Sequence, residues 1–535
     1  MKNFRTFGVM IDVSRNAVMT KDALKEYLTL LSKMGYNMAM LYTEDVYEVE
    51  GEEYFGYMRG RYTKADLREL DEFAASIGVE LIPCIQTLAH LEAYLRWGRV
   101  PKENSDCMLV DEERVYEFID KMLATSRECF RSNRIHIGMD EAMGIGRGAH
   151  LDKHGYEDPN SILKRHLGRV NEMVKAHGYT EPLIWSDMFF RTWNDHKYED
   201  YIGRKEVPSE VKSAVPDDVG LVYWGYSDDN RDTYDSMLYN HRQMSRNVWF
   251  AGGLWGWVGI TPLNAFSIST MKRALDACVK YKVKDVFMTM WADRGSDGSR
   301  FAQLPALYYL AQYAKGVTDE EKIKRGFKRL VGVDYDDFML LDLPNSPGTL
   351  SLSDERTNPS HYMLYCDYFV GYLDCTVERG GGEKYAEYAR LLAEAAKKTR
   401  KYKHLFKVEA LVCEILSHKY ELGIKTREAY KRGDMAELER LAREDYSAIE
   451  RLLPRLISEY RVQWYKDNKP YGFDLHERRI GGLIARTVSC KTRILDYVHG
   501  KISAIEELCE DVLPHYEEGR SILMVGERML TTSLQ

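Results

Sequence analysis

The sequence predicts a (β/α)8 barrel, a TIM-barrel α/β fold, followed by an α-helical C-terminal domain. Eight short apolar segments alternate with longer amphipathic ones over about the first 315 residues. The short segments are almost continuously apolar, which is typical of parallel strands buried on both faces. After about residue 342 only helical periodicity is left. Because 535 residues exceed one ordinary core, we expect a barrel over residues 1–340 and a helical domain over 345–535.

The strand and helix units recur at intervals that suit a barrel with long loops. A doubly wound sheet is the alternative, but Asp12–Asn16, after the first strand, is not a glycine-rich phosphate loop. The predicted strands are Phe7–Val13, Asn37–Thr43, Val79–Gln86, Arg134–Glu141, Pro182–Met188, Gly220–Tyr226, Asn247–Leu254 and Asp285–Trp291.

Helices are predicted between the strands from their apolar spacing and their first residues. Thr63 and Asp66 form the Thr-x-x-acid pattern of a capping box. The predicted helices are Lys21–Lys33, Thr63–Ala75, Glu112–Phe130, Asn160–His177, Ser267–Lys280 and Phe301–Tyr313.

The C-terminal region begins with a connector, Leu343–Ser360, that is rich in Pro, Ser and Asn. Pro454 is expected to kink or break the helix in which it lies. Asp467–Arg479 interrupts the helical pattern, and we expect either a plain surface turn or an aromatic loop that reaches the barrel. One predicted helix carries an apolar stripe: Ala442, Tyr446, Ile449, Leu453, Leu456 and Tyr460.

Composition narrows the class of protein. A net charge of -8 argues against a nucleic-acid partner. No apolar run of about 18 residues predicts a membrane span, and the N-terminus lacks the apolar core of a signal peptide. The nine cysteines are scattered and form no CxxC pair, so we expect free thiols, no metal site, no cofactor and a cytoplasmic location. A homo-oligomer is left open.

Polar and aromatic residues gather where the predicted strands end. In a barrel these ends meet in one bowl, which is where such folds carry their chemistry. Indole rings suit the apolar faces of sugars, and charged groups suit sugar hydroxyls, so the set indicates a sugar pocket. The candidate catalytic residues are Asp140 and Glu141; the candidate binding residues are Arg15, His90, His136, Trp185, Trp224, Tyr226, Trp255, Trp291 and Asp293.

Each of these residues also has a plainer interpretation. A lone Trp on a strand is more often a core residue, and Arg15 can simply pair with Asp12. His136 is more often a hydrogen-bonded interior histidine than a metal ligand. The gathering of so many such residues at equivalent strand ends favours the functional interpretation.

Three segments resemble family 20 glycoside hydrolases, the exo-β-N-acetylhexosaminidases. His136–Glu141, HIGMDE, resembles the HxGGDE signature of that family, with Met139 in place of the second Gly. Asp12–Asn16 resembles the first-strand segment that carries a sugar-binding Arg. Trp291–Asp293 resembles the eighth-strand Trp-x-Glu, with Asp for Glu. The resemblance spans about residues 5 to 315 and is closest to the compact branch without an N-terminal α/β domain.

The resemblance implies release of terminal β-linked GlcNAc or GalNAc from oligosaccharides or glycoconjugates by a retaining, substrate-assisted mechanism. Glu141 would be the acid and base, and Asp140 would orient the 2-acetamido group whose oxygen attacks the anomeric carbon. Arg15 would bind the sugar O3 and O4.

The remaining candidates receive supporting roles from the same resemblance. Tyr226 would bind the acetamido oxygen, and Asp293 a hydroxyl. His90 or His136 would tune the carboxylates. The walls of the pocket would be Trp185, Trp224, Trp255 and Trp291. The rival functions are a non-catalytic sugar-binding barrel and a different retaining glycosidase.

Overall fold

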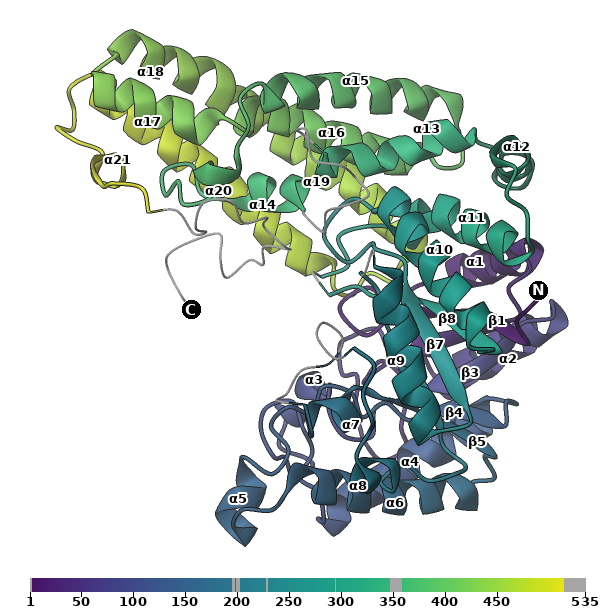
Figure 1. The fold of residues 1–535 in the computed structure, drawn as a ribbon. Helices are drawn as coiled ribbons and strands as arrows, with labels where there is room; N and C mark the ends of the chain where they lie inside the picture. The colour runs from purple at the N-terminus through teal and green to yellow at the C-terminus, as the bar shows by residue number, and fades with distance from the viewer. Residues whose placement is uncertain are drawn as a thin grey trace. The chain divides into compact units, whose positions relative to one another are not determined.

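Eight parallel strands form the centre of the N-terminal part of the chain. The computed structural model describes residues 2–194, 198, 203–227, 230–293, 295–346 and 358–513. Within them the strands close into a barrel in sequence order, which confirms the predicted fold class (Figure 1). The strands are β1 (Thr6–Asp12), β2 (Met38–Tyr42), β3 (Glu80–Cys84), β4 (Arg134–His136), β5 (Glu181–Trp185), β6 (Gly220–Trp224), β7 (Val248–Gly253) and β8 (Asp285–Met290).

The strand register brings the C-terminal ends of the first four strands to one level. Asp12 pairs with Tyr42, Tyr42 with Cys84, and Cys84 with His136. The segments that follow these residues therefore leave the barrel at the same end.

Helices connect the strands around the barrel (Figure 1). The predicted capping box at Thr63 is confirmed, since the Thr63 side chain accepts from the Asp66 amide and Asp66 accepts from the Thr63 amide. The helices are α1 (Lys21–Met34), α2 (Lys64–Ser76), α3 (Glu92–Leu95), α4 (Glu113–Cys129), α5 (Ala149–His154), α6 (Pro159–Ala176), α7 (Asp187–Arg191), α8 (Ser209–Lys212), α9 (Arg231–Met244), α10 (Asn264–Lys280) and α11 (Leu304–Ala314).

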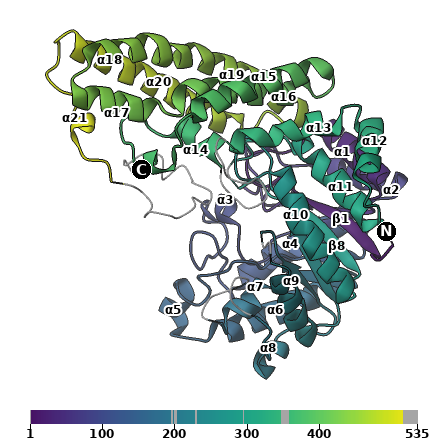
Figure 2. The same cartoon turned by 45° about the horizontal axis from the view of Figure 1, so that its top comes forward.

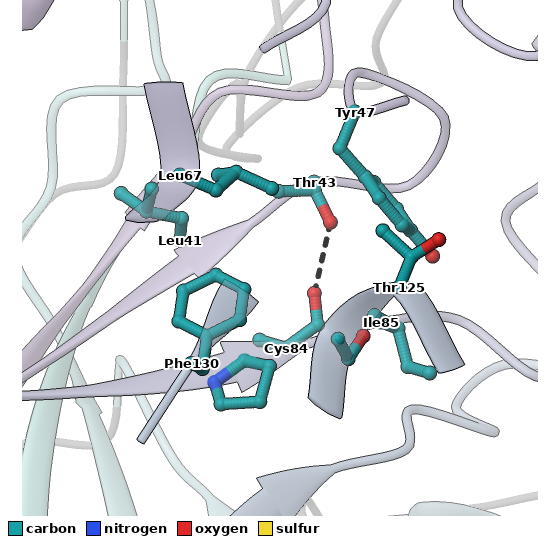
Figure 3. A pocket seen from close by; sticks show the side chains of 10 residues that line it. Leu41, Thr43, Tyr47, Leu67, Cys84, Ile85, Thr125 and Phe130 are labelled. Atoms are coloured by element: carbon teal, nitrogen blue, oxygen red, sulfur yellow. Dashed lines mark hydrogen bonds between the residues drawn. The ribbon is translucent and has the colours of Figure 1, made fainter. Parts of the chain in front are cut away.

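A small cavity lies outside the barrel wall, between β2 and β3 on one side and α2 and α4 on the other (Figure 3). The Thr43 hydroxyl crosses from β2 to β3 and donates to the Cys84 carbonyl at 3.0 Å. Leu41 and Thr43 face this cavity, so the side chain between them, Tyr42, points to the barrel interior. The other lining residues are mostly apolar.

The chain divides into two compact units. One unit contains all eight strands. The other contains Trp255–Phe266 and Ala292–Ala306, which follow β7 and β8, together with the chain from Glu320 onward. Its helices are α12 (Glu320–Val331), α13 (Tyr335–Met339), α14 (Pro359–Tyr365), α15 (Gly381–Lys398), α16 (Lys403–Lys419), α17 (Leu422–Arg432), α18 (Met435–Leu441), α19 (Ser447–Asp467), α20 (Phe473–Val498) and α21 (Glu506–Cys509).

The second unit is helical, as predicted. Helices α15, α16, α19 and α20 lie side by side in sequence order (Figure 2). Every residue of the predicted apolar stripe is buried. Helix α19 continues through Pro454, so the predicted break does not occur. Packing of the stripe between α16 and α20 compensates for the hydrogen bond that Pro454 cannot donate.

Of the connector Leu343–Ser360, residues 347–357 lie outside the described part of the chain. The interruption at Asp467–Arg479 is shorter than predicted, because α19 extends to Asp467 and α20 begins at Phe473. No helix among the described residues is long and apolar enough to cross a bilayer.

Candidate active site

The backbone after β4 leaves the strand conformation earlier than predicted. The strand predicted over Arg134–Glu141 ends at His136. Gly138, Met139 and Glu141 have φ values of 73°, 69° and 49°, which no β-strand accommodates. Gly138 is required here for a second reason, because a Cβ at this position would lie 2.0 Å from Gln86 Oε1. The two carboxylates therefore follow a tight left-handed turn.

Left-handed backbone is concentrated around this turn. Glu44, His90, Met139 and Glu141 all have positive φ, although none is glycine. Such conformations cost about 1–3 kcal/mol each and occur mainly at functional sites. Met139, which replaces the second Gly of the HxGGDE signature, keeps a φ that glycine adopts freely, and its side chain is fully buried.

Asp140 and Glu141 are neighbours with opposite surroundings. Asp140 is buried; its carboxylate accepts from Gln86 Nε2 at 2.8 Å and lies 3.2 Å from His90 Nε2. The Glu141 side chain is 45% exposed and lies 3.7 Å from His90 Nε2 and 3.7 Å from Arg191 Nη2. One carboxylate is thus fixed in place, and the other is open to solvent or substrate.

His90 is a cation between the two acids. Burial alone would lower its pKa, but the charge and hydrogen bond of Asp140, with a further contribution from Glu44, raise the pKa to about 10. Burial alone would likewise raise the pKa of Asp140, yet His90 and Gln86 outweigh it and the pKa is lowered. Asp140 is therefore ionised at neutral pH.

Asp187 holds the backbone of Glu141. The sequence placed it on the fifth strand beside Trp185, but β5 ends at Trp185 and Asp187 begins α7. Its Oδ2 accepts from the Glu141 amide and from Arg191 Nε, both at 3.1 Å. Burial first, and then the charge of Asp140, raise the pKa of Asp187 to about 7.

Arg15 is paired in this structure. Its Nε lies 3.5 Å from Asp12 Oδ2, and its Nη1 lies 3.3 Å from Glu44 Oε1. Burial raises the pKa of Glu44 to about 7, although Arg15 acts against the rise. The Tyr42 hydroxyl donates to Glu44 and accepts from Gln86 Nε2, which also donates to Asp140. A continuous polar chain therefore joins Arg15 to the acid pair.

Aromatic rings form the other side of the site. The Trp291 ring lies edge-on to Tyr42, with the ring centroids 4.7 Å apart, and 6.1 Å from Trp185. Tyr226 stacks on Trp224 at 5.2 Å and is hydrogen-bonded by Trp291. These contacts connect the ends of β2, β5, β6 and β8.

His136 is an interior residue of this wall. It is fully buried, its ring lies 4.5 Å from that of Trp185, and its Nδ1 accepts from the Gly138 amide. Burial lowers its pKa to about 3, so the imidazole is neutral. His136 therefore stabilises the turn through its hydrogen bond and carries no charge. This agrees with its plainer interpretation as a hydrogen-bonded interior histidine.

Nine of the eleven predicted site residues therefore belong to one contact network inside the barrel unit. The other two, Trp255 and Asp293, belong to the second compact unit. Trp255 stacks on Trp257 at 4.3 Å, and Asp293 is exposed. Among the residues that the structure describes, no group of three His, Cys, Asp or Glu side chains is arranged to hold a metal ion.

Sequence reasoning missed some members of the network. Tyr42 was treated as part of a strand, although strand alternation places it inward. Arg191 carried one signal, its four-residue spacing from Asp187, which has meaning only because α7 is a helix. Gln86, Glu44 and Asp187 stand at predicted strand ends, but nothing in the sequence indicated which polar groups they contact.

Two family models match the chain. "Glycosyl hydrolase family 20, catalytic domain" matches residues 4–203, and "Glycoside Hydrolase 20C C-terminal domain" matches residues 336–524. The first covers β1 to β5 with the acid pair, and the second covers most of the helical unit.

Curated relatives and solved structures of the same family are similar over part of the chain. Hexosaminidase D of Bos taurus is 24% identical over 218 residues, which are 38% of this chain and 59% of that protein. Hexosaminidase D of Homo sapiens is 26% identical over 221 residues, 38% of this chain and 42% of that protein. The match thus spans about half the length of these relatives.

The structure of a GH20 exo β-N-acetylglucosaminidase from Vibrio harveyi in complex with N-acetylglucosamine aligns with 63% of this chain and 58% of its own, at 16% identity and a TM-score of 0.48. The two family models carry the assignment, since both come from one family and they match both parts of the chain. The chain therefore belongs to glycosyl hydrolase family 20.

Proposed function

We propose that this chain is a β-N-acetylhexosaminidase that releases non-reducing terminal GlcNAc or GalNAc from oligosaccharides and glycoconjugates. The observation that carries the proposal is the pair formed by a buried, ionised Asp140 and an adjacent, half-exposed Glu141. Family membership and the names of the Hexosaminidase D relatives support it.

The proposed chemistry uses the substrate as its own nucleophile. The 2-acetamido oxygen attacks the anomeric carbon while Glu141 gives its proton to the leaving glycosidic oxygen, and an oxazolinium ion forms. Asp140 accepts a hydrogen bond from the acetamido N–H and stabilises the positive ring. Water then attacks the anomeric carbon, Glu141 takes a proton from it, and the acetamido group is restored with overall retention.

The geometry suits this division of roles. Gln86 and His90 fix Asp140, so it is preorganised toward one developing charge. Glu141 is held by Asp187 through its backbone amide, and its half-exposed carboxyl group can exchange a proton with a substrate. Two adjacent residues on one turn are poorly placed to flank a glycosidic bond from opposite sides as acid and covalent nucleophile.

The other network residues receive binding roles in this proposal. Arg15 exchanges part of its pairing with Asp12 and Glu44 for the sugar O3 and O4, as a guanidinium fork does with two adjacent acceptors. Tyr226 binds the acetamido oxygen, and Trp185, Trp224 and Trp291 form the wall. Sugar-binding roles are also proposed for Trp255 and Asp293, which stand on the segments after β7 and β8.

We further assign the chemistry to the barrel region, residues 1–340, and a supporting role to the helical region, residues 345–535. A reducing, cytoplasmic location completes the proposal, because all nine cysteines are free thiols.

A panel of aryl β-glycosides tests the function. We expect rapid hydrolysis of 2-acetamido-2-deoxy glycosides, very slow hydrolysis of β-glucosides and β-galactosides, and tight binding of a thiazoline analogue of the oxazolinium ion. Equal rates with and without the acetamido group, or a trapped glycosyl ester on a carboxylate, would indicate an ordinary retaining glycosidase. Sugar binding without turnover of any substrate would indicate a non-catalytic barrel.

A further inference from the structure

An exposed cluster of aromatic rings lies on the loops after β2 and β3, outside the network described above. Tyr54, Tyr57 and Trp97 have ring centroids 5.1 to 6.1 Å apart. Tyr57 is 51% exposed and Trp97 is 37% exposed. Large aromatic groups gathered on a surface usually mark a binding site, because their exposure to water is unfavourable. We refer to these three residues as the aromatic platform.

Two arginines flank the platform. The Arg99 guanidinium lies 4.4 Å from the Tyr54 ring centroid, and that of Arg96 lies 5.1 Å from the Trp97 centroid. Both arginines are exposed, and neither is paired with an acid among the described residues. Their N–H groups are therefore available beside the rings. Ring faces with nearby hydrogen-bond donors are suited to a sugar, whose one face is apolar and whose edge carries acceptor oxygens.

The two loops that carry the platform are held to each other. Phe55 packs edge-on against Tyr94 at 5.1 Å, and the Tyr94 hydroxyl donates to Glu52 at 2.6 Å. Glu52 also accepts from Arg114 and Lys121 of α4. The two loops are thus joined to each other and to α4 before any ligand arrives, which limits the entropy that the loops lose on binding.

The platform stands on the same two loops as residues of the candidate active site. Arg59, two residues after Tyr57, donates to Asp45 at 2.8 Å and to the Ser14 carbonyl. Asp45 and Ser14 are the chain neighbours of Glu44 and Arg15. On the other loop, His90 contacts both acids and lies seven residues before Trp97. Both loops therefore carry a network residue at their start and a platform ring further along.

We propose that the aromatic platform binds sugar residues on the reducing side of the bond to be cleaved. This inference rests on the proposed function and adds to it: the preferred substrate is an oligosaccharide chain rather than a single sugar on a small aglycone. The terminal N-acetylhexosamine occupies the barrel network, and the following sugars stack on Trp97 and Tyr57 while Arg96 and Arg99 donate to their oxygens.

The test compares short and long substrates. Aryl N-acetylhexosaminide, a β-1,4-linked N-acetylglucosamine disaccharide and the corresponding tetrasaccharide are assayed with wild type, Trp97→Ala, Tyr57→Ala and Trp97→Phe. We expect Trp97→Ala to lower kcat/KM for the tetrasaccharide about five- to ten-fold, mainly through KM, while the aryl substrate is unaffected. Trp97→Phe, which keeps a ring, should recover much of the loss.

Tyr239→Ala is the matched control. Tyr239 is a tyrosine on α9 that is 41% exposed, with the Arg204 guanidinium 5.5 Å from its ring centroid, so it reproduces the ring and cation of the platform elsewhere. It should leave all three substrates unchanged. Equal effects of Trp97→Ala on the aryl and tetrasaccharide substrates would overturn the proposal, as would a change of oligomeric state in place of a change of KM.

The proposal for the platform and the proposed function can be rejected independently. If the aryl glycoside is cleaved but chain length and platform variants have no effect, the platform assignment is wrong and the hydrolase stands. If no glycoside is cleaved, the proposed function is wrong, and calorimetric binding of the tetrasaccharide to wild type and Trp97→Ala decides the platform. Equal affinity, or none in wild type, would then reject it.

Discussion

Two clusters of buried carboxylates and histidines, one in each compact unit, use the same side chains to different ends. In the second unit, Asp297 of the segment after β8 lies 2.8 Å from His361 Nδ1, 3.3 Å from His476 Nδ1 and 3.0 Å from Arg479 Nη1. Burial alone would raise the pKa of Asp297, but these three neighbours hold it well below its ordinary value. One acid is surrounded by three bases.

The barrel site has the opposite balance. Its acids outnumber its bases, and two of them, Glu44 and Asp187, have pKa values raised to about 7. The five carboxyls are Asp12, Glu44, Asp140, Glu141 and Asp187, against the three cations Arg15, His90 and Arg191. A cluster in which every acid has basic neighbours, such as that of Asp297, is suited to hold chain segments together. A cluster with excess acids and a half-exposed carboxyl group can exchange protons and accept a ligand. The Asp297 cluster therefore suits a structural role, and the barrel site suits the proposed chemical one.

The Asp297 cluster also indicates a structural role for the C-terminal helices α19 and α20. His476 and Arg479 belong to α20, and Ser299 of the same β8 segment donates to Asp467 at the end of α19. Both ends of the sequence interruption at Asp467–Arg479 thus contact the segment that carries Asp293. Within the second unit, these helices hold a segment that follows a barrel strand.

The largest effect is expected on kcat, from a change at the half-exposed Glu141 of the barrel site. Glu141→Gln keeps the shape of the side chain and removes its exchangeable proton, so kcat on an unactivated disaccharide should fall about 10² to 10⁴-fold. The loss should be smaller for an aryl substrate with a good leaving group, which needs less protonation. Stability, measured by guanidinium unfolding, should change little because Glu141 is half exposed. A disaccharide rate equal to wild type would exclude Glu141 as the acid.

For the Asp297 cluster we expect the reverse: a loss of stability with little change in kcat. Asp297→Asn leaves Arg479 and two histidines around a neutral amide, and breaking such a buried pair typically costs about 3–5 kcal/mol. The free energy of unfolding should fall accordingly, while kcat per folded molecule on an aryl glycoside is retained. If this variant lost chemistry without losing stability, the distinction between the two clusters would not hold.

A third difference should appear in the pH dependence of stability. The folded pKa of Asp187 is about 7, above the unfolded value near 3.8, so the folded state keeps a proton that the unfolded state releases. Stability contributed by this group is therefore complete below about pH 4 and declines toward pH 7, by at most about 1.4 kcal/mol per pH unit.

Asp187→Asn should flatten that decline, because an amide does not ionise and still accepts from the Glu141 amide. The free energy of unfolding is measured with guanidinium at pH 5, 6 and 7. The stability of the variant relative to wild type should increase as the pH rises. A constant difference across this range would contradict the raised pKa.

The smallest effect concerns the strained turn. Met139 is buried with a φ of 69°, so Met139→Ala and Met139→Gly remove nearly the same packing but only glycine relieves the strain. We expect the glycine variant to be the more stable of the two by about 1 kcal/mol. Chemical unfolding of both variants measures this difference, and an alanine variant of equal or greater stability would show that the turn is not strained in solution.

The sequence by itself determined the barrel, the helical C-terminal region and the place of the acid pair. The periodicity of apolar residues is a local property, and parallel strands buried on both faces leave it unmistakable. Equivalent strand ends then have to meet, so eleven candidate residues could be chosen before any contact was known, and nine of them belong to one network.

Only the tertiary structure decided how these residues act. Asp140 is fixed by Gln86 across 54 residues of sequence, and Glu141 by Asp187 across 46. In the left-handed turn that ends β4 early, Gln86 leaves no room for a Cβ at Gly138. Local patterns carry no record of such contacts, because they depend on which side chains the closed barrel brings together and how deeply it buries them.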